Sequence, residues 1–76
     1  MSIKTETYKD YSDNELREIR NNLYYALTDN VFFGKLPKKL QSYINTENPQ
    51  GGNESTRIGR CISILDKVIV NRFVNQ

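Results

Sequence analysis

Residues 55–74, STRIGRCISILDKVIVNRFV, decide the fold of this chain. Their apolar residues recur with the period of an α-helix, at Ile58, Cys61, Ile62, Leu65, Val68, Ile69 and Phe73. A helix that is apolar over so wide an arc must be covered on more than one side. A chain of 76 residues has little other material for that cover. The stretch therefore predicts a long last helix and either self-association or a partner.

A β-strand is the open alternative for this stretch, because five of its residues are β-branched: Ile62, Ile64, Val68, Ile69 and Val70. The length of the stretch and the lack of a clean alternating pattern favour the helix. Either Ser55 or Thr56 is expected to cap it. The preceding residues 46–53, TENPQGGN, combine Asn-Pro with Gly-Gly and predict an exposed loop.

An earlier helix is predicted to begin at Ser12. Glu15 follows three residues later, which is the spacing of a capping box, and Tyr11 and Leu16 are placed to form a hydrophobic staple. One helical face then carries Leu16, Ile19, Leu23, Ala26 and Leu27. This pattern predicts a helix that runs to about Thr28.

The middle of the chain predicts a short helix. Pro37 suits a first helical position, and apolar side chains follow with helical spacing: Leu36, Leu40, Tyr43 and Ile44. Residues 31–33, Val-Phe-Phe, fit a short strand, a plug into the core or a helical turn. The plug or the turn is favoured, because no other strong strand exists to pair with this run.

These patterns together predict an all-α fold. We expect a small three-helix domain with long first and last helices, which assembles into a symmetric homo-oligomer. Residues 1–10 are polar and mixed in charge and are expected to form a flexible N-terminal arm. Residues 11–76 are expected to form a single helical domain.

Composition argues against several classes of function. The chain has no histidine and a single cysteine, so we expect no His- or Cys-rich zinc site, no disulfide framework and no cofactor. Its carboxylates form no recognisable catalytic motif, and we expect a non-enzyme. The balance of 11 basic against 9 acidic residues argues against DNA binding. The chain has no apolar run for a signal or a membrane span, and we expect a cytoplasmic protein.

Two arginines and two tyrosines are candidates for ligand contact. Arg57 and Arg60 lie three apart, on one face near a helix start, where guanidinium and backbone N–H groups can hold a phosphate. The alternative is that both are solvated or bond to Glu54 or to loop carbonyls. Tyr8 and Tyr11 offer rings that can stack on nucleobases, although tyrosines are also ordinary interface residues.

A resemblance to a known family rests on two segments of the chain. Residues 58–61, Ile-Gly-Arg-Cys, are followed by residues 72–74, Arg-Phe-Val, and Arg72 lies fourteen residues after Ile58. This is similar to the last helix of the phage anti-CBASS cyclic-oligonucleotide sponges. Residues 8–15, YKDYSDNE, resemble the start of the same family. The family's lysine on the first long helix has no counterpart, because Leu23 stands at that spacing.

The resemblance implies a compact helical protein that assembles into a symmetric oligomer, a hexamer. It would bind cyclic di- or trinucleotides without cleaving them, in the cytoplasm of an infected host cell, so that the host immune effector never meets its second messenger. By the same resemblance, Tyr8 would stack on a base and Arg60 would pair with a phosphate. Arg20 would replace the missing lysine if the alignment contains a gap.

The alternative function is a small inhibitor or regulator that binds a host protein through an apolar, tyrosine-rich face. Tyr24 and Tyr25 are two of the tyrosines that could form this face. Because they are adjacent, they must point to different faces of a helix, and one of them is expected in the core.

Overall fold

The computed structural model describes residues 5–45 and 53–75, and this part of the chain is all-helical without a strand. Its elements in chain order are the 3₁₀ helix η1 (Thr5–Tyr8) and the α-helices α1 (Asp13–Ala26), α2 (Asn30–Phe33), α3 (Lys38–Asn45) and α4 (Glu54–Val74). The prediction of an all-helical fold is confirmed for the described residues, which hold four α-helices where three were expected. The strand alternative for residues 55–74 is wrong. The predicted loop at residues 46–53 lies outside the described residues except for Asn53.

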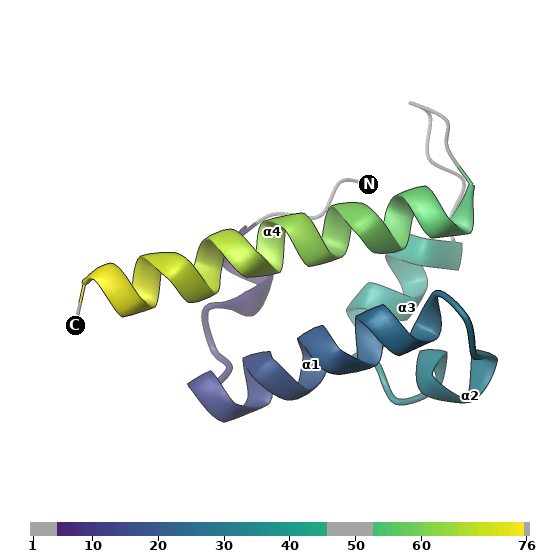
Figure 1. Ribbon diagram of the computed structural model, residues 1–76, viewed down its shortest axis with the longest axis horizontal. Helices are drawn as coiled ribbons and strands as arrows, with labels where there is room; N and C mark the ends of the chain where they lie inside the picture. Colours follow the sequence, from purple (N-terminus) through teal and green to yellow (C-terminus); the bar gives the residue numbers. More distant parts are fainter. Residues whose placement is uncertain (1–4, 46–52, 76) are drawn as a thin grey trace.

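The two long helices, α1 and α4, lie side by side and run in opposite directions (Figure 1). α3 and η1 also pack against α4, while α2 packs against α1. α4 is the longest element, and its last turns extend past the beginning of α1 (Figure 1). The C-terminal end of α4 therefore lacks the neighbours that cover its first turns.

One hydrophobic core holds the described elements together, and no described polar or charged residue is buried in it. Its members come from η1, α1, α3, α4 and the residue before Pro37: Tyr8, Leu16, Ile19, Leu23, Ala26, Leu36, Leu40, Tyr43, Ile44, Ile58, Cys61, Ile62, Leu65 and Val68. The apolar positions predicted on the first helix and on the short middle helix are buried, apart from Leu27. Helical spacing therefore identified most of this core.

The start of α1 follows the predicted capping box. The Glu15 N–H donates to Ser12 Oγ at 3.2 Å, and the Ser12 N–H donates to Glu15 Oε1 at 2.9 Å. Tyr11, just before the cap, is half-buried against the core. These contacts satisfy backbone donors that the first turn of a helix would otherwise leave open.

The cap of α4 differs from the prediction. Asn53 is the cap, and its Oδ1 accepts a hydrogen bond from the Thr56 N–H at 2.9 Å. Ser55 and Thr56, the predicted caps, lie inside the first turn. Asparagine caps a helix as well as serine does, and the loop composition around Asn53 concealed this role.

Residues 31–33 belong to a single helical turn, as one of the favoured alternatives predicts. Asp29 caps the turn by accepting from the Val31 N–H at 2.8 Å. Phe32 and Phe33 pack partly buried against the core, but Val31 is 68% exposed. The three residues therefore do not enter the core together.

The prediction of a flexible arm at residues 1–10 is wrong for residues 5–10. Thr5–Tyr8 form η1, and the Tyr8 side chain is completely buried. The ring replaces contact with water by contact with the core, and this gain outweighs the cost of ordering the polar residues around it. The helical domain thus begins before residue 11, whereas residues 1–4 lie outside the described residues.

The apolar stripe of α4 is largely covered within one chain. Ile58, Cys61 and Leu65 are fully buried by the packing of α1, α3 and η1. Phe73, the last apolar position of the stripe, is 76% exposed instead. The surplus of apolar surface that the sequence indicates is therefore confined to the end of the helix.

Candidate functional site

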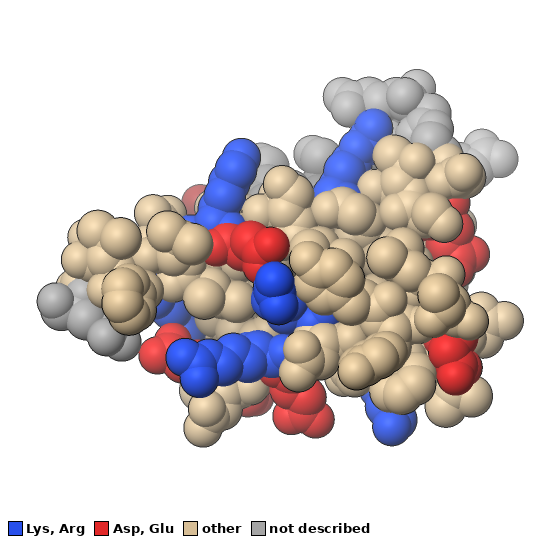
Figure 2. All heavy atoms as spheres, viewed as in Figure 1, with Lys and Arg blue, Asp and Glu red and all other residues tan. Residues whose placement is uncertain are grey.

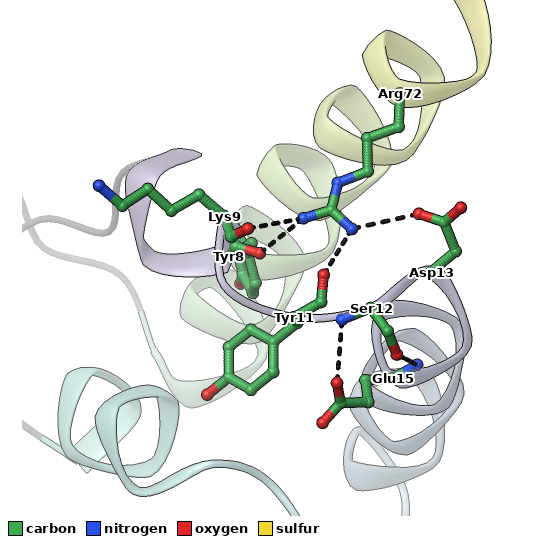
Figure 3. A network of polar contacts seen from close by, with 7 residues as sticks. All are labelled: Tyr8, Lys9, Tyr11, Ser12, Asp13, Glu15 and Arg72. Atoms are coloured by element: carbon green, nitrogen blue, oxygen red, sulfur yellow. Dashed lines mark hydrogen bonds and ion pairs between the residues drawn. The ribbon is translucent and has the colours of Figure 1, made fainter. Parts of the chain in front are cut away.

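Arg72, in the last turn of α4, holds the N-terminal segment in place (Figure 3). Its guanidinium donates to three backbone carbonyls, with Nη2 at 3.2 Å from Tyr8 O and 3.0 Å from Lys9 O, and Nη1 bonded to Tyr11 O. Nη1 also lies 3.1 Å from Asp13 Oδ1, where it forms an ion pair. A planar guanidinium with five donors suits this set of diverging acceptors.

Ile58 and Arg72, the two residues whose spacing carries the family resemblance, both have structural roles in this chain. Ile58 is buried in the core, and the donors of Arg72 already face four oxygen atoms. A phosphate would have to displace those oxygens to reach Arg72. Arg72 is therefore a clamp within the chain.

The two candidate tyrosines lie in different surroundings. The Tyr8 ring is buried, and its hydroxyl donates to the Cys61 carbonyl oxygen at 3.4 Å, so the ring offers no free face for a base. Burial raises the pKa of the Tyr8 hydroxyl above its ordinary value, with a smaller contribution from Cys61. Tyr11 lines a groove of about 340 Å³ together with Glu15 and Glu18, whose carboxylates repel a phosphate.

Arg57 and Arg60 do not act as a matched pair. Arg57 Nη1 donates to the carbonyl oxygen of Ile44 in the last turn of α3 and thereby joins α3 to α4. Arg60 is half-buried one turn later and forms no hydrogen bond or ion pair with any other described residue. The alternative in which Arg57 bonds to Glu54 or to loop carbonyls did not anticipate this contact, because Ile44 lies in a helix.

A groove between α1 and α4 is lined in part by basic side chains. It has a volume of about 590 Å³ and is lined by Arg17, Arg20, Asn21, Asp66, Ile69 and Val70. The face that carries both long helices shows blue cationic side chains beside red acidic ones, along the seam between the helices (Figure 2). The groove combines guanidinium and amide donors with an apolar wall.

Arg20 is held in this groove by two neighbours. Its Nε lies 2.6 Å from Asp66 Oδ1, and its guanidinium carbon lies 4.9 Å from the centre of the Tyr24 ring. The hydrogen bond with Asp66 raises the pKa of Arg20. Arg17 is exposed and makes no bond with a described residue, so its guanidinium is available to a ligand. One carboxylate facing two guanidiniums leaves the groove with a net positive charge.

The structure does not bring the five candidates, Tyr8, Tyr11, Arg20, Arg57 and Arg60, into one site. Only Arg20 lines the groove between α1 and α4. Sequence reasoning missed Arg17, although Arg17 and Arg20 lie three apart on the predicted first helix and must share a face. That spacing is the same signal that singled out Arg57 and Arg60.

Within residues 5–45 and 53–75, no group of three His, Cys, Asp or Glu side chains comes together to hold a metal ion. No helix in the same residues has the length and apolar character needed to cross a lipid bilayer. Comparisons of the chain with protein-family models, with curated proteins and with solved structures find no significant match.

Proposed function

We propose that this protein sequesters cyclic di- or trinucleotides without cleaving them and so blocks host antiphage signalling. The observation that carries the proposal is the groove between α1 and α4, where Arg17 and Arg20 face an apolar wall of Ile69 and Val70. The family resemblance supplies the class of ligand. The proposal includes assembly into a symmetric homo-oligomer, a hexamer.

The composition of the groove suits a cyclic oligonucleotide. Guanidinium groups bind phosphate oxygens through paired, charge-assisted hydrogen bonds. The apolar side chains of Ile69 and Val70 provide a surface for the face of a base. The volume of about 590 Å³ lies within the range of roughly 300–1,000 Å³ that is usual for small-molecule sites.

Asp66 sets the affinity of the groove for anions. Its carboxylate already pairs with Arg20, so a phosphate must compete with it for that guanidinium. The pair is about 40% exposed on both sides, and such pairs contribute little free energy. Phosphate can therefore exchange for Asp66 at low cost, and Arg17 adds a second contact.

Isothermal titration of the purified protein against a panel of cyclic di- and trinucleotides tests the proposal. We expect binding that weakens in Arg17→Gln and Arg20→Gln and that persists in Lys39→Gln, a matched loss of one exposed cation on α3. An absence of binding to every member of the panel would reject the proposal. Binding that is lost equally in all three variants would place the ligand elsewhere.

A second candidate function is inhibition or regulation of a host protein. The observation in its favour is the apolar end of α4, where Val70, Phe73 and Val74 are exposed. Large exposed apolar side chains at one place are typical of protein-binding surfaces. A stoichiometric host protein captured by the wild type and lost in Phe73→Ser, without any bound nucleotide, would favour this function.

A further inference from the structure

Asn21 is an uncharged polar residue in the groove between α1 and α4. It lines the groove from α1, together with Arg17 and Arg20. Arg17 shares a helix face with the residues three and four positions later, so α1 presents an amide beside two guanidiniums. The Asn21 side chain is exposed and forms no hydrogen bond with any other described residue. Its amide is therefore available to a ligand in the groove.

The side of the groove that α4 forms offers no second amide among the described residues. Asp66, Ile69 and Val70 line this side. The Asp66 carboxylate pairs with Arg20, and the side chains of Ile69 and Val70 carry no hydrogen-bonding group. A base that lies on this apolar wall meets an uncharged donor and acceptor at Asn21, across the groove on α1.

The two guanidiniums of the groove match the two phosphates of a cyclic dinucleotide. Each phosphodiester carries one negative charge, and a guanidinium binds phosphate oxygens through paired, charge-assisted hydrogen bonds. When a phosphate displaces Asp66, the Tyr24 ring still holds Arg20 in place, because the ring centre lies 4.9 Å from the guanidinium carbon. Asn21 is then the group that remains to bind the edge of a base.

An amide side chain distinguishes adenine from guanine at one edge of the purine ring. Adenine N6–H donates to the amide oxygen and adenine N7 accepts from the amide N–H, which is the usual pairing of asparagine with adenine. Guanine presents two acceptors, O6 and N7, at the same edge. The amide oxygen would therefore face guanine O6, and one of the two hydrogen bonds would be lost.

We propose that Asn21 selects adenine, so that the groove binds cyclic dinucleotides of adenine in preference to those of guanine. The adenine ring lies on Ile69 and Val70 with N6 and N7 towards Asn21, while Arg17 and Arg20 bind the phosphates. This inference rests on the proposed function, because it names the base that the same groove recognises. Asn21 determines the specificity of the groove, and the two arginines supply its affinity for phosphate.

Isothermal titration with cyclic di-AMP and cyclic di-GMP tests the role of Asn21. We expect the wild type to bind cyclic di-AMP about tenfold more tightly than cyclic di-GMP. Asn21→Ala should weaken the binding of cyclic di-AMP and leave that of cyclic di-GMP unchanged, which abolishes the preference. Asn71→Ala is the matched control, because Asn71 is an exposed asparagine on α4 that does not line the groove, and it should keep the preference.

An analogue of cyclic di-AMP with carbon in place of N7 gives a second measurement, because it removes one acceptor and keeps the shape of the base. It should bind the wild type more weakly than cyclic di-AMP and should bind Asn21→Ala as well as cyclic di-AMP does. Equal binding of the adenine and guanine ligands by the wild type, or a preference that Asn21→Ala retains, would overturn this inference and leave the proposed function standing. Binding of no cyclic nucleotide at all would reject the proposed function and this inference with it.

Discussion

Arg72 Nη2 lies 3.2 Å from the carbonyl oxygen of Tyr8, where η1 ends. The last carbonyls of a helix have no partner within the helix, and a cation near them is favourable. Arg72 thus caps η1 from 64 residues away along the chain. The same guanidinium fixes the polypeptide that leads into α1 through its bonds with Tyr11 O and Asp13.

Replacing Arg72 with alanine should loosen the N-terminal segment and destabilise the protein by about 2 kcal/mol, because several hydrogen bonds to one charged group are lost. Chemical denaturation measures the change in the free energy of unfolding, and hydrogen exchange should show faster exchange around residues 8–13. Arg60→Ala is the control on the same helix and should change stability by less than about 0.5 kcal/mol. Equal effects of the two variants would contradict a clamp at Arg72.

Tyr8 should matter for its ring more than for its hydroxyl. Tyr8→Ala leaves a cavity in the core and should cost about 3–5 kcal/mol, a large share of the stability of a domain this small. Tyr8→Phe keeps the ring and loses only the long 3.4 Å bond to Cys61 O, so it should cost about 1 kcal/mol or less. Thermal unfolding of both variants decides this point. If Tyr8→Ala left the stability unchanged, the segment around Tyr8 would be a flexible arm instead.

The capping box should make stability depend on pH in the acid range. The Ser12 backbone N–H, and to a lesser extent its side chain, lowers the pKa of Glu15 below the ordinary value of 4.5. A carboxylate with a lowered pKa stabilises the fold above its unfolded pKa, and this contribution is lost as the pH falls through the folded value. The stability difference between wild type and Glu15→Ala should therefore shrink below about pH 4.5. Glu18→Ala, on the exposed side of α1, should not follow this course.

Asp66→Asn should tighten nucleotide binding in the groove. The change removes the carboxylate that competes for Arg20 and adds one positive unit to the net charge. We expect an affinity gain of several-fold, since one exposed ion pair contributes about 0.2–1 kcal/mol. Titration at two salt concentrations should show the gain falling as salt screens the charges. A weaker affinity in Asp66→Asn would show that Asp66 contacts the ligand.

Cys61 should react slowly with thiol reagents in the folded protein. Burial raises the pKa of its thiol to about 11, and the reactive thiolate is therefore scarce near neutral pH. The rate of modification, followed by absorbance, should rise sharply in denaturant. It should also rise in Arg72→Ala, because release of the N-terminal segment uncovers the side of Cys61 that Tyr8 packs against. Rapid modification of the native wild type would contradict this burial.

Periodicity and capping chemistry predicted the helices well, because both act over a few neighbouring residues. The box of Ser12 and Glu15 and the helical spacing from Ile58 to Val68 are local signals, and the structure uses them as expected. The buried Tyr8 bonds to Cys61, which is 53 residues away, and no local pattern indicates this contact. The same is true of the carbonyls that Arg72 binds.

The prediction that one of two adjacent tyrosines, Tyr24 or Tyr25, lies in the core is wrong. Tyr24 and Tyr25 are 44% and 56% exposed, so neither is in the core, where one of them was expected. Both have apolar or cationic neighbours at the surface instead: Tyr25 packs on Phe32 with ring centres 4.9 Å apart, and Tyr24 lies beside Arg20. The tyrosine side chains that are buried in the core are those of Tyr8 and Tyr43.

The candidate ligand residues were harder to place than the helices. A guanidinium binds a phosphate or a backbone carbonyl with the same donors, so a sequence shows that an arginine can bind oxygen and does not show which oxygen it meets. Arg57 and Arg72 meet carbonyls of their own chain. Arg17 and Arg20 face the groove, because the turn of α1 that carries them lies opposite the half of α4 that has fewer neighbours.

The bonds from Arg72 to the segment around Tyr8 also set an order of events during synthesis. Chains emerge from the ribosome starting at the N-terminus, and the oxygens of Tyr8 and Lys9 must wait more than 60 residues for their donor. Until Arg72 has emerged, the segment before α1 lacks its clamp, and contacts between such distant residues form slowly. The segment around Tyr8 in the newborn chain is therefore open to proteases until Arg72 has been made and has emerged.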